Sequence, residues 1–216
     1  MRGLRMLALI AVTIGVVAVG ANALIDRTAQ STDTPTGESP SSEPSPTVVP
    51  SPTPELEGGW KHYVSEKGRF SIVAPGRVAE DRLAVKLWWG RTVFHEIAFL
   101  PDISKDTYRV YYVDLPSEVI ARHPADVLLS AFQRGAVSGY EGRKVKEHPI
   151  TIEGYPCRDV SMEFGDFEIV RLRMCLVEKR FYEVEVVSVR SHLHPDRQRA
   201  LRFLRSFRVI SPIQIL

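Results

Sequence analysis

The pattern of apolar and polar positions divides this chain into three parts. Residues 6–25 form a run of 20 uncharged positions that begins at Met6 and ends at Ile25. Residues 28–58 are rich in serine, threonine and proline. From Gly59 onward apolar and polar residues alternate with a period of two, which is typical of half-buried β-strands. We therefore expect a leader over residues 1–27, a linker over 28–58 and one folded domain over 59–211.

The alternating part predicts an antiparallel β-sheet. Its runs are rich in Val, Ile, Tyr and Phe, and short turns such as Pro75-Gly76 and Gly165-Asp166 separate them. Short connections favour hairpins between successive strands. The expected strands lie near residues 60–64, 69–74, 78–88, 92–100, 107–114, 144–152, 156–164, 167–178 and 181–190.

Two stretches break the alternation and predict helices. Residues 124–139 begin with Pro124, a residue favoured in the first turn of a helix. Residues 195–207 place apolar residues on one face and arginines on the other. Because each helix has one apolar stripe, each is expected to lie against the sheet, which gives an α+β sandwich. The residues at helical spacing are Val127, Leu128, Ala131, Phe132 and Gly135 in the first helix, and Ala200, Phe203, Leu204 and Phe207 in the second.

The leader admits two interpretations. Arg2 and Arg5 precede the apolar run and hold the N-terminus in the cytoplasm. At about 1.5 Å per residue the run spans roughly 30 Å, the thickness of the hydrocarbon core, so it fits a membrane anchor. The small residues of Ala21-Asn22-Ala23 instead suit a signal peptide that is cleaved near Ala23. Either alternative predicts that the domain is extracytoplasmic, anchored in the cytoplasmic membrane or secreted.

The linker has too few large apolar residues to offset the entropy of ordering, so we expect it to be disordered. Its prolines stiffen it toward polyproline II, which lets it extend up to ~90 Å. We interpret it as a passive tether. The alternative is a functional stalk that is glycosylated or crosses a cell wall.

Composition and charge exclude few functions. Hydrophobic residues make up 44% and charged residues 25% of the chain, as in an ordinary globular domain. The net charge of +2 conceals a linker with five acids and no base, and a domain with 25 basic and 20 acidic residues from Gly59 onward. This excess of basic over acidic residues in the domain is smaller than the excess found in nucleic-acid binders, which concentrate basic residues on one surface. No nucleic-acid partner is therefore expected.

The two cysteines, Cys157 and Cys175, form a possible disulfide. Neither lies near the end of the apolar run, which disfavours a lipid-anchored protein. A two-residue turn at 165–166 would place Cys157 opposite Met174 and the two cysteines on opposite faces of the sheet. A three-residue loop would place Cys157 opposite Cys175, and only that register brings the sulfur atoms together.

Five short segments follow one another in a recognisable order. They are Gly59-Trp60-Lys61-His62-Tyr63, Gly68-Arg69-Phe70-Ser71-Ile72-Val73-Ala74-Pro75, Tyr111-Tyr112-Val113-Asp114-Leu115-Pro116, Gly154-Tyr155-Pro156-Cys157-Arg158-Asp159 and Phe203-Leu204-Arg205-Ser206-Phe207. Together they resemble bacterial PsbP-like domains over nearly all of residues 59–209. The resemblance implies an antiparallel sheet flanked by helices and a noncatalytic role in binding or assembly. It carries over no metal-binding or photosystem-binding residue, and Cys157 stands where a small residue is expected.

Two places in the domain are candidate partner-binding sites. Trp88 and Trp89 precede Gly90 at a hairpin turn, where alternation directs one of the two away from the core and an exposed pair would mark a contact surface. Tyr155 and Arg158 lie where a turn leads into a strand. Either they reach a ligand at the end of the sheet, or Gly154 and Pro156 shape the turn while Arg158 and Asp159 pair on the surface.

Catalytic signals are weak. His192, His194 and Asp196 have a spacing that suits metal ligands, although Pro195-Asp196 more simply begins the last helix. The sequence contains no nucleophile elbow and no phosphate-binding glycine loop. The arginine row Arg199, Arg202 and Arg205 is interpreted as a solvated helix face. We expect no catalytic residue, no metal and no other cofactor.

The sequence therefore predicts a noncatalytic extracytoplasmic binding or assembly module. Its partner is expected to be an envelope protein or a small ligand, and residues 6–25 would hold it in the cytoplasmic membrane if they are not cleaved. The alternative is an envelope metal-dependent hydrolase that uses His192, His194 and Asp196.

Overall fold

The computed structural model describes residues 55–56, 59–101, 106–140, 143–164, 168–189 and 195–210. The predicted leader lies outside these residues, as does the predicted linker except for Glu55 and Leu56. Within the described part of the chain, no helix is both long enough and apolar enough to cross a membrane.

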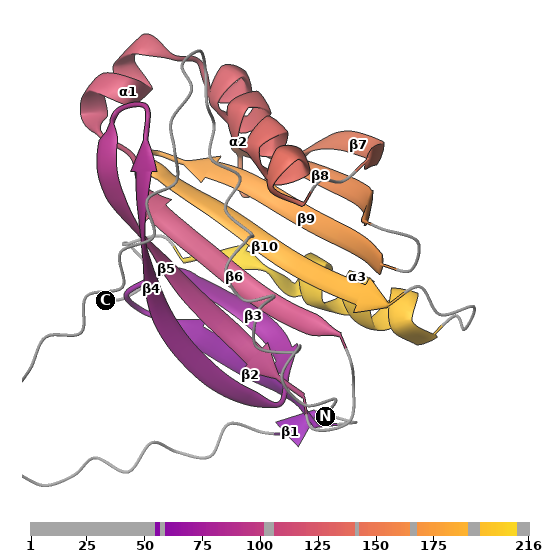
Figure 1. Ribbon diagram of the computed structural model, residues 1–216. Coiled ribbons are helices and arrows are strands. Elements are labelled where there is room, and N and C mark those ends of the chain that lie inside the picture. The colour runs from indigo at the N-terminus through magenta and orange to yellow at the C-terminus, as the bar shows by residue number, and fades with distance from the viewer. Residues whose placement is uncertain are drawn as a thin grey trace, which may run out of the picture.

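A seven-stranded antiparallel sheet forms the middle layer of the domain (Figure 1). A smaller, four-stranded sheet has the order β1–β2–β3–β11. In spatial order the strands of the large sheet are β4 (Arg77–Leu87), β5 (Gly90–Leu100), β6 (Thr107–Asp114), β10 (Arg180–Val189), β9 (Glu168–Val177), β8 (Tyr155–Phe164) and β7 (Arg143–Ile152). Those of the small sheet are β1 (Glu55–Leu56), β2 (Trp60–Ser65), β3 (Phe70–Pro75) and β11 (Arg208–Val209).

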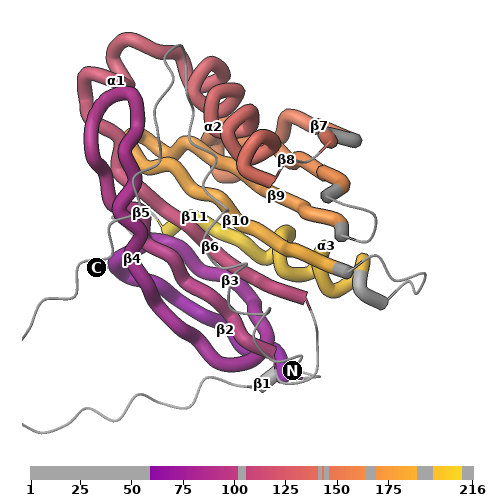
Figure 2. Tube along the Cα trace, in the orientation of Figure 1, coloured from indigo at the N-terminus to yellow at the C-terminus, as the bar shows by residue number. Residues whose placement is uncertain are grey.

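Each face of the large sheet is covered by a different layer. Helices α1 (Ser117–Arg122) and α2 (Ala125–Gly139) pack on one face, while α3 (Pro195–Ser206) and the small sheet pack on the other. Figure 2 shows the β4–β5 hairpin running from the small sheet to the neighbourhood of α1. The predicted α+β class, an antiparallel sheet flanked by helices, is confirmed.

Strict alternation along the central strands builds two cores. The first core lies under α3 and the small sheet, and the second core lies under α1 and α2. In β10, Tyr182, Val184 and Val186 enter the first core, whereas Phe181 enters the second. This alternation follows from the two-residue period of a strand.

The connection between the two sheets depends on one glycine. Gly76 follows β3 with a φ of +78°, and a Cβ atom placed there would lie 2.0 Å from the carbonyl oxygen of Leu100. Only glycine combines this backbone conformation with such a close approach. The predicted turn at Pro75-Gly76 therefore carries the chain from the small sheet into β4.

Several elements differ from the sequence-based expectation. The strands expected near residues 60–64 and 69–74 exist as β2 and β3, but they belong to the separate small sheet. They pack face to face on the large sheet, and Phe70 and Ile72 of β3 are fully buried in the first core between the two sheets. The short elements α1, β1 and β11 were not predicted. Each is too brief to show a period in the sequence.

The β8–β9 register follows the three-residue alternative. Phe164 pairs with Glu168, and Cys157 pairs with Cys175. A disulfide joins these two cysteines, whose Cα atoms are 4.1 Å apart, and both lie in the first core.

Candidate functional site

A polar groove of about 260 Å³ lies beside the turn that joins β2 to β3. We call it the His95 groove. Its lining comes from β4, β5 and β6 and from the turn, and consists of Lys67, Glu80, Asp81, Arg82, His95, Glu96, Ile97 and Tyr112.

Strand register places the floor of the groove. Arg82 of β4 pairs with His95 of β5, and His95 pairs with Tyr112 of β6. Paired residues of antiparallel strands project from the same face of the sheet. The three side chains therefore form one row across three strands, on the face that carries the first core.

His95 is held flat against an aromatic ring. Its imidazole stacks on Tyr112 with ring centroids 4.7 Å apart and an angle of 11° between the planes. Partial burial lowers the pKa of His95, and the positive charges of Lys67, Arg82 and Arg180 lower it further. The imidazole is therefore neutral at pH 7. Within the described residues, no side chain hydrogen-bonds to it.

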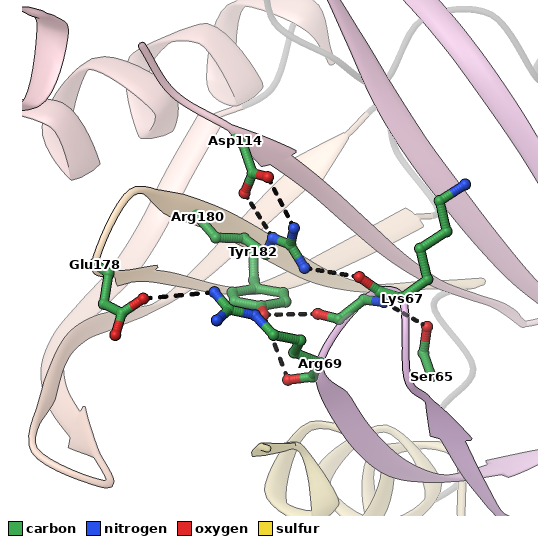
Figure 3. Close-up of polar contacts among 8 residues, drawn as sticks. Ser65, Lys67, Arg69, Asp114, Glu178, Arg180 and Tyr182 are labelled. Carbon is green, nitrogen blue, oxygen red and sulfur yellow. Dashed lines mark hydrogen bonds and ion pairs between the residues drawn. The ribbon is translucent and has the colours of Figure 1, made fainter. Parts of the chain in front are cut away.

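A network of polar contacts fixes the turn that carries Lys67 (Figure 3). The guanidinium of Arg180 donates to both carboxylate oxygens of Asp114, at 2.7 and 2.8 Å, and to the carbonyl oxygen of Lys67 at 2.8 Å. The Tyr182 hydroxyl donates to the carbonyl oxygen of Gly68 at 2.7 Å. Two side chains of β10 thus hold the backbone of the turn, and Asp114 of β6 orients one of them.

The same network places a third cation at the groove. The Cζ atom of Arg180 lies 5.1 Å from the centre of the Tyr112 ring, a distance at which a cation interacts favourably with an aromatic face. Asp114 balances this charge, and its pKa is lowered chiefly by the hydrogen bonds from Arg180.

The two remaining cations share the groove with the carboxylates of Glu80, Asp81 and Glu96. The side chains of Lys67 and Arg82 are exposed and have no partner among the described residues. The nearby Glu80 accepts a hydrogen bond from the Tyr63 hydroxyl at 3.2 Å. Burial, followed by the charge of Glu80, raises the pKa of Tyr63 to about 12, so this hydroxyl remains a donor. The groove therefore presents two cations without an ion pair and a neutral imidazole, next to a carboxylate of Glu80 that the Tyr63 hydroxyl engages.

The predicted tryptophan site lies at the tip of the β4–β5 hairpin. Trp88 is 46% exposed and makes edge-to-face contacts with Trp89 and with His123. Trp89 is half-buried and contacts Phe132 of α2. One tryptophan thus points outward and the other inward, and binding by this pair stays a prediction.

The second predicted site is divided by the sheet. Tyr155 packs against the first core, whereas Arg158 lies on the opposite face and contacts α2. The Arg158 guanidinium donates to Gln133 at 2.7 Å and pairs with Glu147 at 2.9 Å. The structure does not bring Tyr155 and Arg158 together, and it gives Arg158 partners that attach α2 to β7 and β8.

The predicted metal ligands lie mostly outside the described residues. His192 and His194 belong to a segment that is not described, and Asp196 is in the first turn of α3. Within the described ranges, no group of three or more His, Cys, Asp or Glu side chains has a geometry that could hold a metal ion.

The sequence analysis missed the His95 groove. Its residues come from four separate segments, and no motif connects them. One signal was present: His95 stands between Val93 and Ile97 at an apolar-rich position of the alternation. A polar residue at such a position is a candidate for a site, although the partners on β4 and in the turn come from strand pairing alone.

Comparison with known proteins relates this chain to solved structures alone. No protein-family model and no curated protein matches this sequence. Among solved structures, the chain is similar to the solution structure of cyanobacterial PsbP (CyanoP) from Synechocystis sp. PCC 6803, with a TM-score of 0.50 and 11% identity. The similarity covers 74% of this chain and 99% of CyanoP. The chain has a PsbP-like fold. At this level of identity, the similarity shows the fold alone.

Proposed function

We propose that this chain is a noncatalytic extracytoplasmic binding module of the PsbP-like type, and that it holds an anionic group of an envelope partner in the His95 groove. The observation that carries the proposal is that two cations without an ion pair among the described residues, Lys67 and Arg82, line the groove together with a neutral imidazole. A carboxylate or phosphate group there would accept hydrogen bonds from both cations.

The location is inferred from the N-terminal sequence. Arg2 and Arg5 precede the apolar residues 6–25, which favours export of everything that follows. We propose that this segment tethers the domain through the proline-rich linker. The PsbP-like fold supports the noncatalytic assignment, because the sequence resemblance implies binding or assembly roles.

Anion binding and protonation of His95 are coupled, which gives the proposal a specific pH dependence. An anion beside His95 favours the protonated imidazole, so binding raises the pKa of His95. By reciprocity, the affinity for the anion increases as the pH falls through that pKa. A site made only of lysine and arginine would show no such pH dependence in this range.

The test is an NMR titration of the His95 ring protons in the full chain in detergent solution. Inorganic phosphate and a tetraglutamate peptide serve as probes, which distinguishes a phosphate-selective from a carboxylate-selective groove. Binding of either probe, with an increase in the pKa of His95, is the expected result.

Matched variants distinguish binding in the groove from nonspecific attraction between the probe and the positive charges of the domain. K67S and R82S should each abolish the shift, whereas R122S removes an exposed cation from α1 and should leave it intact. Equal losses in all three variants, or a His95 pKa that neither probe changes, would refute the proposal.

A further inference from the structure

The two edges of the large sheet are built differently. Strand β7 forms one edge, contains Pro149, and has a register irregularity between Lys144 and Lys146. Proline, lysine and bulges on an edge strand all discourage pairing with another chain. This edge is protected by its sequence.

Strand β4 forms the other edge and lacks two of these protections. It pairs with β5 through eleven consecutive positions, from Arg77 to Leu87, without an irregularity and without a proline. Positions 77–84 are all exposed. No described strand pairs with its outer side (Figure 1). Apart from the Arg82 N–H, which donates to the Asp81 carboxylate at 2.7 Å, the backbone groups along that side are therefore available to another strand.

The side chains of β4 suit a second copy of the same strand. In an antiparallel pair related by a two-fold axis, each residue faces a residue from the same face of the sheet. The possible registers are therefore centred on a single residue. Centres at Glu80, Asp81 and Arg82 place each of these charged residues opposite itself.

Of the registers centred on residues 80–84, only one avoids like charges. Centres at Ala79 and Val85 also avoid them, but they pair only five residues of each β4 strand. A centre at Ala84 places Arg82 opposite Lys86. A centre at Leu83 places Glu80 opposite Lys86 on both sides of the axis and Leu83 opposite its own copy. Opposite charges across a strand pair are favourable, and like charges are not. Leu83, which is 37% exposed, would then lie at the centre of the contact.

We propose that β4 is a dimerisation edge, where two copies of the chain pair antiparallel about Leu83 and join their large sheets into one. The inference uses strand geometry and charge alone, and it does not depend on the His95 groove binding an anion.

Cysteine crosslinking tests the register in the full chain in detergent solution. Under mild oxidation L83C should form a covalent dimer, because the two Leu83 Cβ atoms of directly opposed residues lie about 4.5 to 5.5 Å apart. The native cysteines are already bonded to each other. The control is H148C, an exposed position on β7, which should remain monomeric. Equal crosslinking of the two variants would overturn the proposal.

Charge reversal provides a second test with a built-in rescue. E80K places two lysines opposite each other, and K86E places two glutamates opposite each other. Each change should weaken the dimer about tenfold, since two symmetric pairs are lost. The double variant E80K/K86E restores opposite charges and should recover the dimer.

Sedimentation equilibrium measures the association in all four proteins. A wild-type chain that is monomeric at the highest concentration tested, or a double variant as weak as the single ones, would overturn the dimer. Pairing of β4 with an unrelated protein instead of a second copy would also overturn it. The groove is tested separately with K67S, which does not touch β4, so the two proposals can fail independently.

Discussion

The two faces of the large sheet differ in chemistry although they are formed by the same strands. On the first-core face, β6 and β10 present Tyr108, Val110, Tyr182 and Val184. On the second-core face, the same two strands present charged side chains beneath α2, namely Arg109, Glu183 and Glu185. One face is packed with apolar and aromatic groups, whereas the other contains a buried polar network.

In the network on the second face, acids outnumber bases. Arg109 pairs with Glu185 and with Glu96, each at 3.1 Å, and the hydroxyl of Tyr140, the C-cap residue of α2, donates to Glu185. Glu183 is buried, and among the described residues its Oε1 atom has no hydrogen-bond partner. Burial and the neighbouring Glu185 raise the pKa of Glu183 well above its ordinary value.

This difference indicates what each face contributes. Packed rings stabilise the fold almost independently of pH below about pH 10, because phenylalanine does not titrate and tyrosine stays neutral there. A buried charge network stabilises it only while its charges are matched. We therefore expect the first face to set the overall stability and the second to set its dependence on pH.

The largest effect is expected on the aromatic face. Phe203 of α3 is fully buried and contacts Phe99 and Tyr108 edge-to-face, with ring centroids 5.6 and 5.2 Å apart. F203A should lower the free energy of unfolding by about 4 kcal/mol, because it leaves a cavity. Urea denaturation measures the loss. R205A, an exposed change on the same helix, should have little effect.

The next largest effect is expected in the charge network. R109M leaves Glu185 and Glu96 buried without their cation and should cost about 3 kcal/mol at pH 7. The double variant R109M/E185Q also removes one of the carboxylates and should recover part of the loss. A double variant less stable than R109M would show that the pair is not the source of the effect.

The disulfide belongs to the first face and is expected to contribute slightly less. It closes a short loop, with a sequence separation of 18, so replacing both cysteines with alanine should cost about 2.5 kcal/mol. Thermal unfolding with and without a reducing agent gives the same comparison in the wild-type chain. Equal melting temperatures in the two conditions would contradict this expectation.

An effect of opposite sign, which grows as the pH rises, is expected at Glu183. Because the folded state keeps this acid protonated and the unfolded state releases the proton above about pH 4.5, folding stability falls as the pH rises above that value, by up to about 1.4 kcal/mol per pH unit. E183Q removes this dependence. It should therefore be more stable than the wild type at pH 8 and similar at pH 4. A constant difference between the two proteins across this range would contradict a titration of Glu183.

The sequence predicted the strands well and the buried charges poorly. The expected strand near residues 78–88 is β4 at Arg77–Leu87, and the helix expected over 124–139 is α2 at Ala125–Gly139. In β10, however, Glu183 and Glu185 occupy the positions that alternation assigns to solvent. They lie on the side of the sheet that carries α2, where the hydroxyl of Tyr140 at the end of this helix donates to Glu185, and a period of two does not reveal which face a helix covers.

The candidate site was harder to predict than the fold. His95 could be recognised as a polar residue in an apolar-rich strand, but Lys67 and Arg82 join it through the β2–β3 turn and the β4–β5 register. Arg158 was expected near a ligand, yet its partners are Gln133 and Glu147. Contacts between residues distant in the chain depend on which elements pack together, and local patterns carry little of that information.

The sequence by itself determined the strands, the two main helices and the α+β class, because periodicity and turn residues act over a few neighbouring positions. It also limited the disulfide to one of two registers. Only the tertiary structure decided between them, separated β2 and β3 into their own sheet, and assembled the His95 groove. Those outcomes depend on packing and strand pairing across long stretches of chain, where a single residue of loop length moves a side chain from one face of a sheet to the other.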